Sequence, residues 1–189
     1  MITELLTPPA SLPVTLAEMR AQVWQASPER TTDTYLTHLI QSATDQVERI
    51  TWRKIITQEW RVYLNFWPED IVLPFGQIRE LTSVMVKNAA GIIRALDPSE
   101  YNFEIVGGIG AVYPASTGWP LDELAVRNGI MVDFLCGWTI DEVPPTIKHA
   151  ILLLGEHWHR HASPVIVDKI VEEVPLTVDY LLGPWMPVY

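Results

Sequence analysis

The period of the hydrophobic pattern changes twice along this chain of 189 residues, and this change limits the possible folds more than any other feature. Between residues 33 and 53, apolar side chains recur every three or four positions, as on one face of an α-helix. From Trp60 to Leu64, apolar and polar residues alternate, which is typical of a strand with one buried face. Helical spacing then returns in Ile147, Ala150, Ile151, Leu154 and Trp158. The pattern predicts an α+β protein with helices at both ends and strands between them.

Local signals indicate where the helices begin and end. Thr15 and Glu18 form a capping box, so a helix is expected over about residues 16–26, ahead of Pro28. The long helix is expected over about residues 33–53. Pro144-Pro145 fits the first turn of a helix over about 144–162, where a missing amide does no harm. A short helix over about 176–182 ends at Gly183-Pro184.

The middle of the chain is predicted to be a small antiparallel β subdomain over about residues 56–138. Its short apolar runs are separated by Gly, Pro and Asn, and they cover residues 71–73, 78–87, 101–106 and 129–136. We expect residues 1–162 to form a single domain, in which a helical bundle core carries this insertion. Residues 163–189 are expected to form an extended C-terminal docking arm that includes the short helix.

Composition limits the classes of function. Hydrophobic residues make up 48% of the chain and charged residues 19%, below the roughly 25% charged share of ordinary soluble domains, which excludes intrinsic disorder. The formal net charge of −10 argues against an autonomous DNA-binding domain, because neutralising phosphates requires clustered Lys and Arg. Residues 1–94 contain 9 basic and 10 acidic residues, whereas residues 95–189 contain 4 basic and 13 acidic residues. An acidic second half suits a basic protein partner.

Eight tryptophans are the strongest anomaly in the composition. Tryptophan is enriched at protein interfaces, so this number indicates contact surface as well as core. Trp60, within the alternating strand, and Trp158, on the helical stripe, are expected in the core. Trp119, in a loop rich in Gly and Pro, and Trp185, beyond the last helix, are expected at an interface.

The sequence also indicates the cellular compartment in which the protein is made. The single cysteine, Cys136, cannot form an internal disulfide, and its apolar neighbours predict a buried, unreactive thiol. Residues 1–6 lack the basic start of a signal peptide, and no apolar run approaches the ~20 residues of a membrane helix. We expect a protein that is made in the cytosol and has no membrane partner.

No group of residues predicts catalysis. His157, His159 and His161 lie near the end of the third helix, but helical geometry points them in different directions. His157 and His161 alone need a third metal ligand, which the sequence does not identify. We therefore expect no metal, and histidines that face solvent at a helix C-terminus. Gly107–Gly110 lacks the Lys and Ser/Thr of a phosphate-binding loop and is predicted to be a turn, so neither a catalytic residue nor a cofactor is expected.

Taken in order, several segments resemble the head-to-tail connector proteins, also called adaptor or head-completion proteins, of tailed bacteriophages and prophages. The resemblance covers nearly the whole chain and depends on the order and spacing of its segments. The most telling segment is Val143–Leu154, followed by His157-Trp158. The other segments are Leu12–Glu18, Leu39–Glu48, Gln58–Trp60, Ile71–Pro74, Leu81–Val84, Gly118–Pro120, Val174–Leu176 and Leu181–Trp185.

This resemblance implies a structural virion protein that is not an enzyme. Such proteins form a ring, expected to be dodecameric, on the portal protein of a DNA-filled head, and they provide the docking surface for the next neck or tail protein, a stopper or tail terminator. Genomic DNA passes through the lumen without sequence-specific binding. The implied location is the head–tail junction of a virion assembled in the host cytoplasm. Two alternatives stay open: a tail-completion or tail-terminator protein, and an enzyme that uses a metal at His157 and His161.

Two groups of residues are candidate contact sites. The first group is expected to meet the portal or a neighbouring subunit, and it comprises Leu181, Leu182, Pro184, Trp185, Tyr189 and Trp119. The alternative is that the short C-terminal helix packs on the core of its own subunit. The second group is acidic and is expected to line the lumen or to meet a basic partner, and it comprises Asp141, Glu142, Glu172 and Glu173. The alternative for these carboxylates is an ordinary solvated surface.

Overall fold

The structure is a computed structural model that describes residues 1–24, 32–116, 118–120, 123–161 and 176–186. The chain divides into two compact units. The β unit comprises Met1–Ala10 and Ile56–Trp138, and the helical unit comprises Ser11–Ile55 and Thr139–Tyr189. Four α-helices and two antiparallel sheets confirm the α+β prediction.

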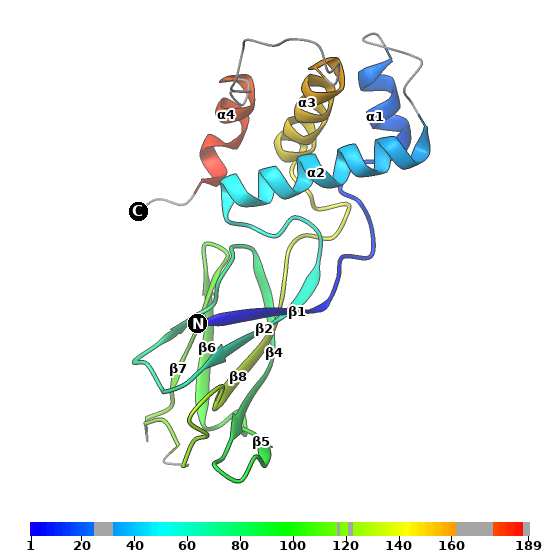
Figure 1. The fold of residues 1–189 in the computed structure, drawn as a ribbon. Coiled ribbons are helices and arrows are strands. Elements are labelled where there is room, and N and C mark those ends of the chain that lie inside the picture. The colour runs from blue at the N-terminus through cyan, green and yellow to red at the C-terminus, as the bar shows by residue number, and fades with distance from the viewer. Residues whose placement is uncertain (25–31, 117, 121–122, 162–175, 187–189) are drawn as a thin grey trace, which may run out of the picture. The chain divides into compact units, whose positions relative to one another are not determined.

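The helical unit is built around its longest helix, α2. Its elements are α1 (Leu16–Val23), α2 (Asp33–Thr51), α3 (Pro145–His161), α4 (Leu176–Leu182) and the 3₁₀ turn η1 (Gly183–Trp185). Figure 1 shows α4, α3 and α1 lying in a row along α2, and each of them packs against it. In the described part of the chain, no helix is both long and apolar enough to span a membrane.

Local sequence explains how the first two helices begin and end. The predicted capping box at α1 is confirmed, because the Glu18 amide donates to Thr15 Oγ1 and the Thr15 amide donates to Glu18 Oε2. The helix predicted to reach residue 26 ends at Val23, with Trp24 as its C-cap, and the residues from 25 onward lie outside the described part. Helix α2 ends at Thr51 and not at the predicted residue 53, because Trp52 takes a left-handed conformation with φ of 52°.

Apolar stripes from all four helices form the core of the helical unit. The fully buried residues include Met19, Leu36, Ile40, Ala43, Val47, Ile147, Ile151, Leu154, Val178 and Leu182. Gly155 allows α3 to approach α1 closely, since a Cβ there would lie 2.5 Å from Met19 Cε. The predicted stripe of α3 is confirmed for Ile147, Ile151 and Leu154, whereas Trp158 at its end is only half-buried.

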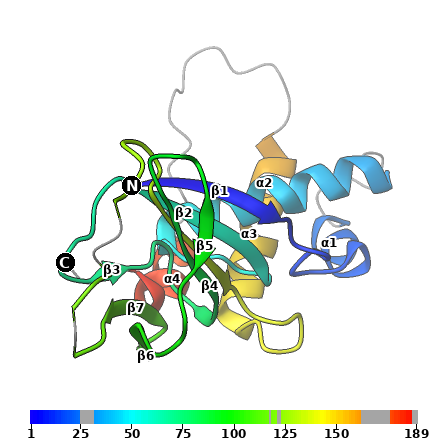
Figure 2. The same ribbon diagram turned by 90° about the horizontal axis from the view of Figure 1, so that it is seen from below.

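The β unit contains a five-stranded sheet and a three-stranded sheet (Figure 2). The larger sheet has the order β1 (Ile2–Thr7), β2 (Gln58–Leu64), β8 (Ile130–Cys136), β4 (Ile78–Lys87) and β5 (Ile93–Ala95). The smaller sheet has the order β3 (Ile71–Val72), β7 (Ile109–Pro114) and β6 (Tyr101–Val106). All neighbouring strands are antiparallel, as predicted, but the sequence pattern predicts no strand over residues 2–7, where the structure has β1.

The core of the β unit lies between the two sheets. Val62, Val132 and Phe134 contribute from the larger sheet, and Ile71 and Val112 contribute from the smaller one. A Cβ on Gly110 would lie 2.9 Å from Ile78 Cγ2, so glycine allows β7 to approach β4. Gly107 and Gly108, both with positive φ, form the turn between β6 and β7 and confirm the prediction of a turn there.

Candidate functional site

The end of the chain, where partner contact was predicted, packs partly on its own helical unit. Val178 and Leu182 of α4 are fully buried, so Leu182 is already covered without a partner. Leu181 is half-buried and Pro184 is exposed. The packing of α4 on α3 and α2 matches the alternative that the sequence left open for this helix.

Trp185 is anchored to the helical unit by three contacts. Its indole Nε1 donates to Thr146 Oγ1 at 3.2 Å, and its carbonyl accepts from Arg53 Nε at 3.2 Å. The Arg53 guanidinium also lies over the indole ring, 6.0 Å from its centroid. Burial lowers the pKa of Arg53, because desolvation disfavours its charged form. These contacts hold η1 against the residues that follow α2 and against the first turn of α3.

The outer face of α4 carries apolar residues that nothing in the described chain covers. Leu176 is 77% exposed and Tyr180 is 83% exposed. They lie four residues apart, so their side chains share one face of the helix. An exposed Leu–Tyr pair beside an anchored tryptophan is a candidate contact surface, here called the α4 face. Tyr189, also predicted at an interface, lies outside the described residues.

The tryptophans are distributed differently from the prediction. Trp138 is the buried one, whereas Trp60 and Trp158, predicted in the core, are half-buried. Trp24 and Trp52 are exposed and were not identified as interface residues from the sequence. Both follow the last residue of a helix, where the apolar stripe has ended, and this position is the signal that could have identified them.

Trp119 contacts its own β unit. Its ring stacks on Trp67 with centroids 4.2 Å apart and planes 9° apart, and its Nε1 donates to the Pro68 carbonyl at 2.7 Å. The side chain is half-buried at the edge of the core. Stacking and the hydrogen bond therefore account for this tryptophan within the chain.

The acidic candidates are exposed where the structure describes them. Asp141 and Glu142 lie in the turn before α3, and both are exposed. Glu142 shapes this turn, because its amide donates to the Thr139 carbonyl and its Oε2 accepts from the Thr139 amide. Glu172 and Glu173 lie outside the described residues.

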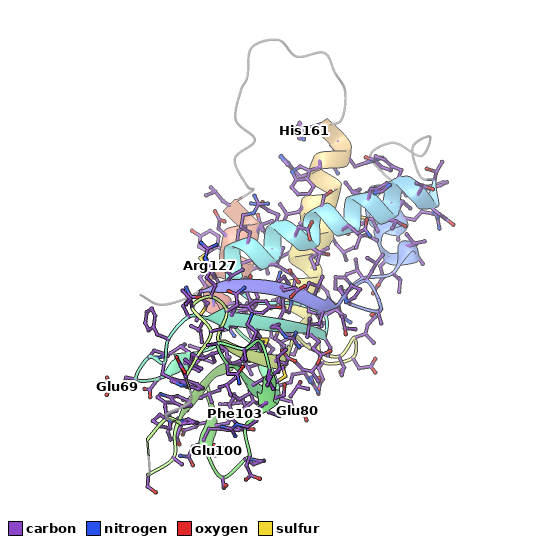
Figure 3. All side chains as sticks on the ribbon, turned by 60° about the horizontal axis from the view of Figure 1, so that its bottom comes forward. Glu69, Glu80, Glu100, Phe103, Arg127 and His161 are labelled. Atoms are coloured by element: carbon purple, nitrogen blue, oxygen red, sulfur yellow. The ribbon has the colours of Figure 1, made fainter. Side chains whose placement is uncertain are left out.

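Of the four histidines of α3, the three near its C-terminal end have different surroundings. His159 is buried, and its Nδ1 hydrogen-bonds the Tyr35 hydroxyl at 3.1 Å, so the expectation that it faces solvent is wrong. Helix α3 packs against α1, α2 and α4, and this packing extends its buried face as far as residue 159. Figure 3 shows His161 at the C-terminal end of α3, where its Nδ1 lies 2.7 Å from the His157 carbonyl.

The histidines of α3 do not form a metal site with the other described residues. Among the described residues, no three His, Cys, Asp or Glu side chains are placed to hold one ion. The rings of His157 and His161 are close, with centroids 4.4 Å apart, but the described chain offers them no third ligand. Cys136 is fully buried, as predicted, and therefore has no access to a substrate.

Comparison with known proteins identifies the fold. No model of a protein family matches the chain, and no curated protein matches it in sequence. The chain is similar to one in the neck of an empty gene transfer agent (GTA) particle computed with C6 symmetry, with 17% identity and a TM-score of 0.79. It is also similar to chains in the neck of the native GTA particle computed with C12 symmetry (18%, 0.77) and in the virion of the native particle (17%, 0.78). Each match covers 100% of this chain and 97% of the other, so the whole chain has the fold of a GTA particle protein.

Proposed function

We propose that the chain is a structural neck protein of a phage-like particle, a connector ring that binds the portal of the DNA-filled head and receives the next neck or tail protein. The main support is the likeness in fold, over the full chain, to proteins in the necks of GTA particles. The order of the segments that resemble phage connectors agrees with it. Symmetric neck assemblies of such chains favour a ring of copies, and we propose twelve.

The surface of the chain is consistent with a subunit that has several neighbours. Trp24 and Trp52 are exposed on the helical unit, and so are Leu176 and Tyr180 of the α4 face. Large exposed aromatic and aliphatic side chains are typical of protein contacts and are costly on a free surface. A ring subunit with a portal on one side, a neck protein on the other and two copies beside it provides partners for such residues.

Removing the gene from the parent particle tests this function. Loss of a connector leaves DNA-filled heads and separate tails, because DNA packaging is complete but the protein that links head to tail is missing. Purified chain added to the separated parts then restores joining. Tails that lack their head-proximal end would indicate a tail-completion protein instead, and normally joined particles would contradict both roles.

We further propose that the α4 face and the C-terminal arm beyond it, including Pro184 and Tyr189, dock on the portal or on a neighbouring subunit. Leu176→Ser with Tyr180→Ser removes the exposed pair and leaves the buried side of α4 intact. The expected result is loss of portal binding in co-sedimentation, while the exposed Asp179→Ser on the same helix serves as the matched control. Equal binding by both variants would contradict docking through this face.

The second part of the proposal concerns the acidic residues and the lumen of the ring. Asp141 and Glu142, with Glu172 and Glu173, are proposed to line the lumen, where like charges repel the DNA phosphates within a Debye length of ~8 Å. Asp141→Lys is the cleaner variant, because Glu142 also shapes its turn. We expect slower or incomplete DNA ejection from particles that carry Asp141→Lys, and normal packaging and ejection would place this residue outside the lumen.

A further inference from the structure

The outward side of the three-stranded sheet carries exposed aliphatic residues beside Asn102 and Glu104, although outward positions of a sandwich are ordinarily polar. Ile71 and Val112 point into the core, so the alternate residues of β3, β6 and β7 point outward. Among these outward residues, Val72, Val106 and Ile109 are 52–65% exposed. Ala111 pairs directly with Val72 on one side and with Glu104 on the other, and Ile109 pairs with Val106. An apolar patch therefore extends over the three strands with one outward carboxylate beside it.

The outward side of the five-stranded sheet carries an apolar row of its own. Direct pairing across the sheet places one residue from each strand side by side: Ile2, Tyr63, Met131, Met85 and Ala95. The alternate residues Val62, Val84 and Val132 fill the core, so this row faces outward. Met131, in the central strand, is only 4% exposed, so the accessible apolar surface of the row comes from its other four members. Methionine and tyrosine are adaptable side chains that are enriched at protein contacts.

Next to this row, Arg61 and Asp133 form an ion pair of opposite charges. Arg61 on β2 donates to both carboxylate oxygens of Asp133 on β8, at 2.6 and 2.8 Å, and Ser83 on β4 donates to the same carboxylate. The hydrogen bonds to Asp133 raise the pKa of Arg61 further above its already high ordinary value. A bidentate pair of this kind neutralises these two charges, while the carboxylate of Glu4, which pairs with Arg61 across β1 and β2, accepts a hydrogen bond from the Tyr63 hydroxyl.

We propose that these two outward faces meet between neighbouring copies of the chain, the three-stranded face of one β unit against the five-stranded face of the next. The inference rests on the proposed ring and names the surfaces that close it. The faces differ in composition and lie on opposite sides of one sandwich, so a contact between them is heterologous. A repeated heterologous contact with the correct rotation generates a closed ring, as in the C12 and C6 assemblies that contain this fold.

The chemistry of the three-stranded face favours a copy of the chain over DNA. Strands β3, β6 and β7 contain no Lys or Arg, and their single charged residue is Glu104, which is exposed. Binding of a phosphate backbone requires the opposite sign of charge. The apolar row of the five-stranded sheet has the matching character, since both faces lose apolar surface to water when they come together.

Chemical crosslinking in assembled particles tests the contact. Val106→Cys places a thiol on the three-stranded face, and Met85→Cys places one on the five-stranded face. The natural Cys136 is fully buried and is not expected to react with the crosslinker. With a flexible bis-maleimide, the double variant is expected to give a ladder of dimers, trimers and larger products. Each single variant is expected to stay monomeric, because the same residue on two neighbours is separated by a whole sandwich. Ile2→Cys, on the same row, replaces Met85→Cys if that variant folds poorly.

Each other result overturns the proposal. Crosslinking of one single variant to itself would show a symmetric contact instead of a heterologous one. Full labelling of both positions by a monofunctional maleimide, with no ladder, would show that both faces are free in the particle. Crosslinking to a different neck protein would assign the face to that protein. Absence of the chain from purified particles would instead contradict the proposed function itself.

Discussion

The two units of this chain fold by different means and present different surfaces. The helical unit buries stripes of residues that are close in sequence, and two of its exposed aromatic residues, Trp24 and Trp52, lie where helices end, whereas Tyr180 lies on the α4 face. The β unit depends on pairing between distant segments, such as β2 with β8, and some of its exposed aliphatic residues, among them Val72, Val106 and Ile109, lie on the outward faces of its sheets. In each unit, the secondary structure therefore determines where large apolar side chains stay exposed to solvent.

The largest expected effect on stability concerns a glycine of the β unit. Gly137 has φ of +97°, and a Cβ there would lie 2.5 Å from the Ile56 carbonyl oxygen. Gly137→Ala adds backbone strain to a clash with backbone atoms that cannot move aside. We expect it to lower the free energy of unfolding by about 3 to 5 kcal/mol, measured by urea denaturation.

A matched control separates the clash from the strain. Gly91 also has a positive φ of +82°, but a Cβ there would meet no atom within 4 Å. Gly91→Ala is therefore expected to cost only about 1 kcal/mol. Hydrogen exchange should show that Gly137→Ala weakens the amides of the β unit and leaves those of the helical unit protected. Equal loss in both units would mean that they unfold as one.

The ion pair of the β unit gives the next largest effect. Asp133 is nearly buried, and Asp133→Asn leaves the Arg61 guanidinium with a neutral partner in place of a carboxylate. We expect a loss of about 2 to 4 kcal/mol, which is less than for a fully buried pair because Arg61 keeps some contact with water. The double variant Arg61→Met with Asp133→Leu is expected to recover most of this loss. If the double variant does not recover stability, the Arg61–Asp133 pair is more stabilising than an apolar pair in the same place.

The sequence predicted the helical unit better than the β unit, for a physical reason. Helix periodicity and caps are local, so α2, α3 and α4 were placed within a few residues of their observed bounds. The strand β1 was missed because its residues alternate weakly and pair with β2, more than fifty positions away. Sheet order likewise depends on non-local pairs that no short window of sequence contains.

The candidate site was predicted less completely than the fold. The sequence predicts Trp185 at an interface but does not predict its contacts with Arg53 and Thr146, because these residues lie far away in sequence. Exposure of Leu176 and Tyr180 depends on which side of α4 packs inward, and seven residues are too few to define that side from periodicity. The apolar outward rows of the β unit became visible only with the strand register.

The capping box of α1 gives a smaller, pH-dependent effect in the helical unit. Hydrogen bonds from the Thr15 amide and hydroxyl lower the pKa of Glu18. A lowered folded pKa means stability that is present above the unfolded pKa, about 4.3, and is lost as the pH falls through the folded value. Thr15→Ala is expected to cost about 1 kcal/mol at neutral pH.

The pH dependence is checked with a second variant. Glu18→Gln should be less stable than the natural chain at pH 7, and the gap should narrow as the pH falls below about 4, where the natural carboxylate also becomes neutral. Urea titrations at several pH values measure this gap. A gap that is constant with pH would show that the carboxylate charge contributes nothing to the cap.

The smallest expected change is a gain in stability. Trp52 holds a left-handed conformation with φ of 52° at the end of α2, a position that suits glycine or asparagine, and its exposed side chain has little packing to lose. Trp52→Gly is therefore expected to stabilise the helical unit by about 0.5 kcal/mol or leave it unchanged. If the Trp52 ring contacts a neighbouring protein in the neck, the same variant lowers incorporation of the chain into particles. In that case the natural chain keeps a strained residue because assembly needs it, although the residue lowers stability. Trp52→Asn, which also tolerates this conformation, should behave alike. A loss of stability in both variants, with normal incorporation, would make Trp52 a structural residue and would remove it from the contact surface of the helical unit.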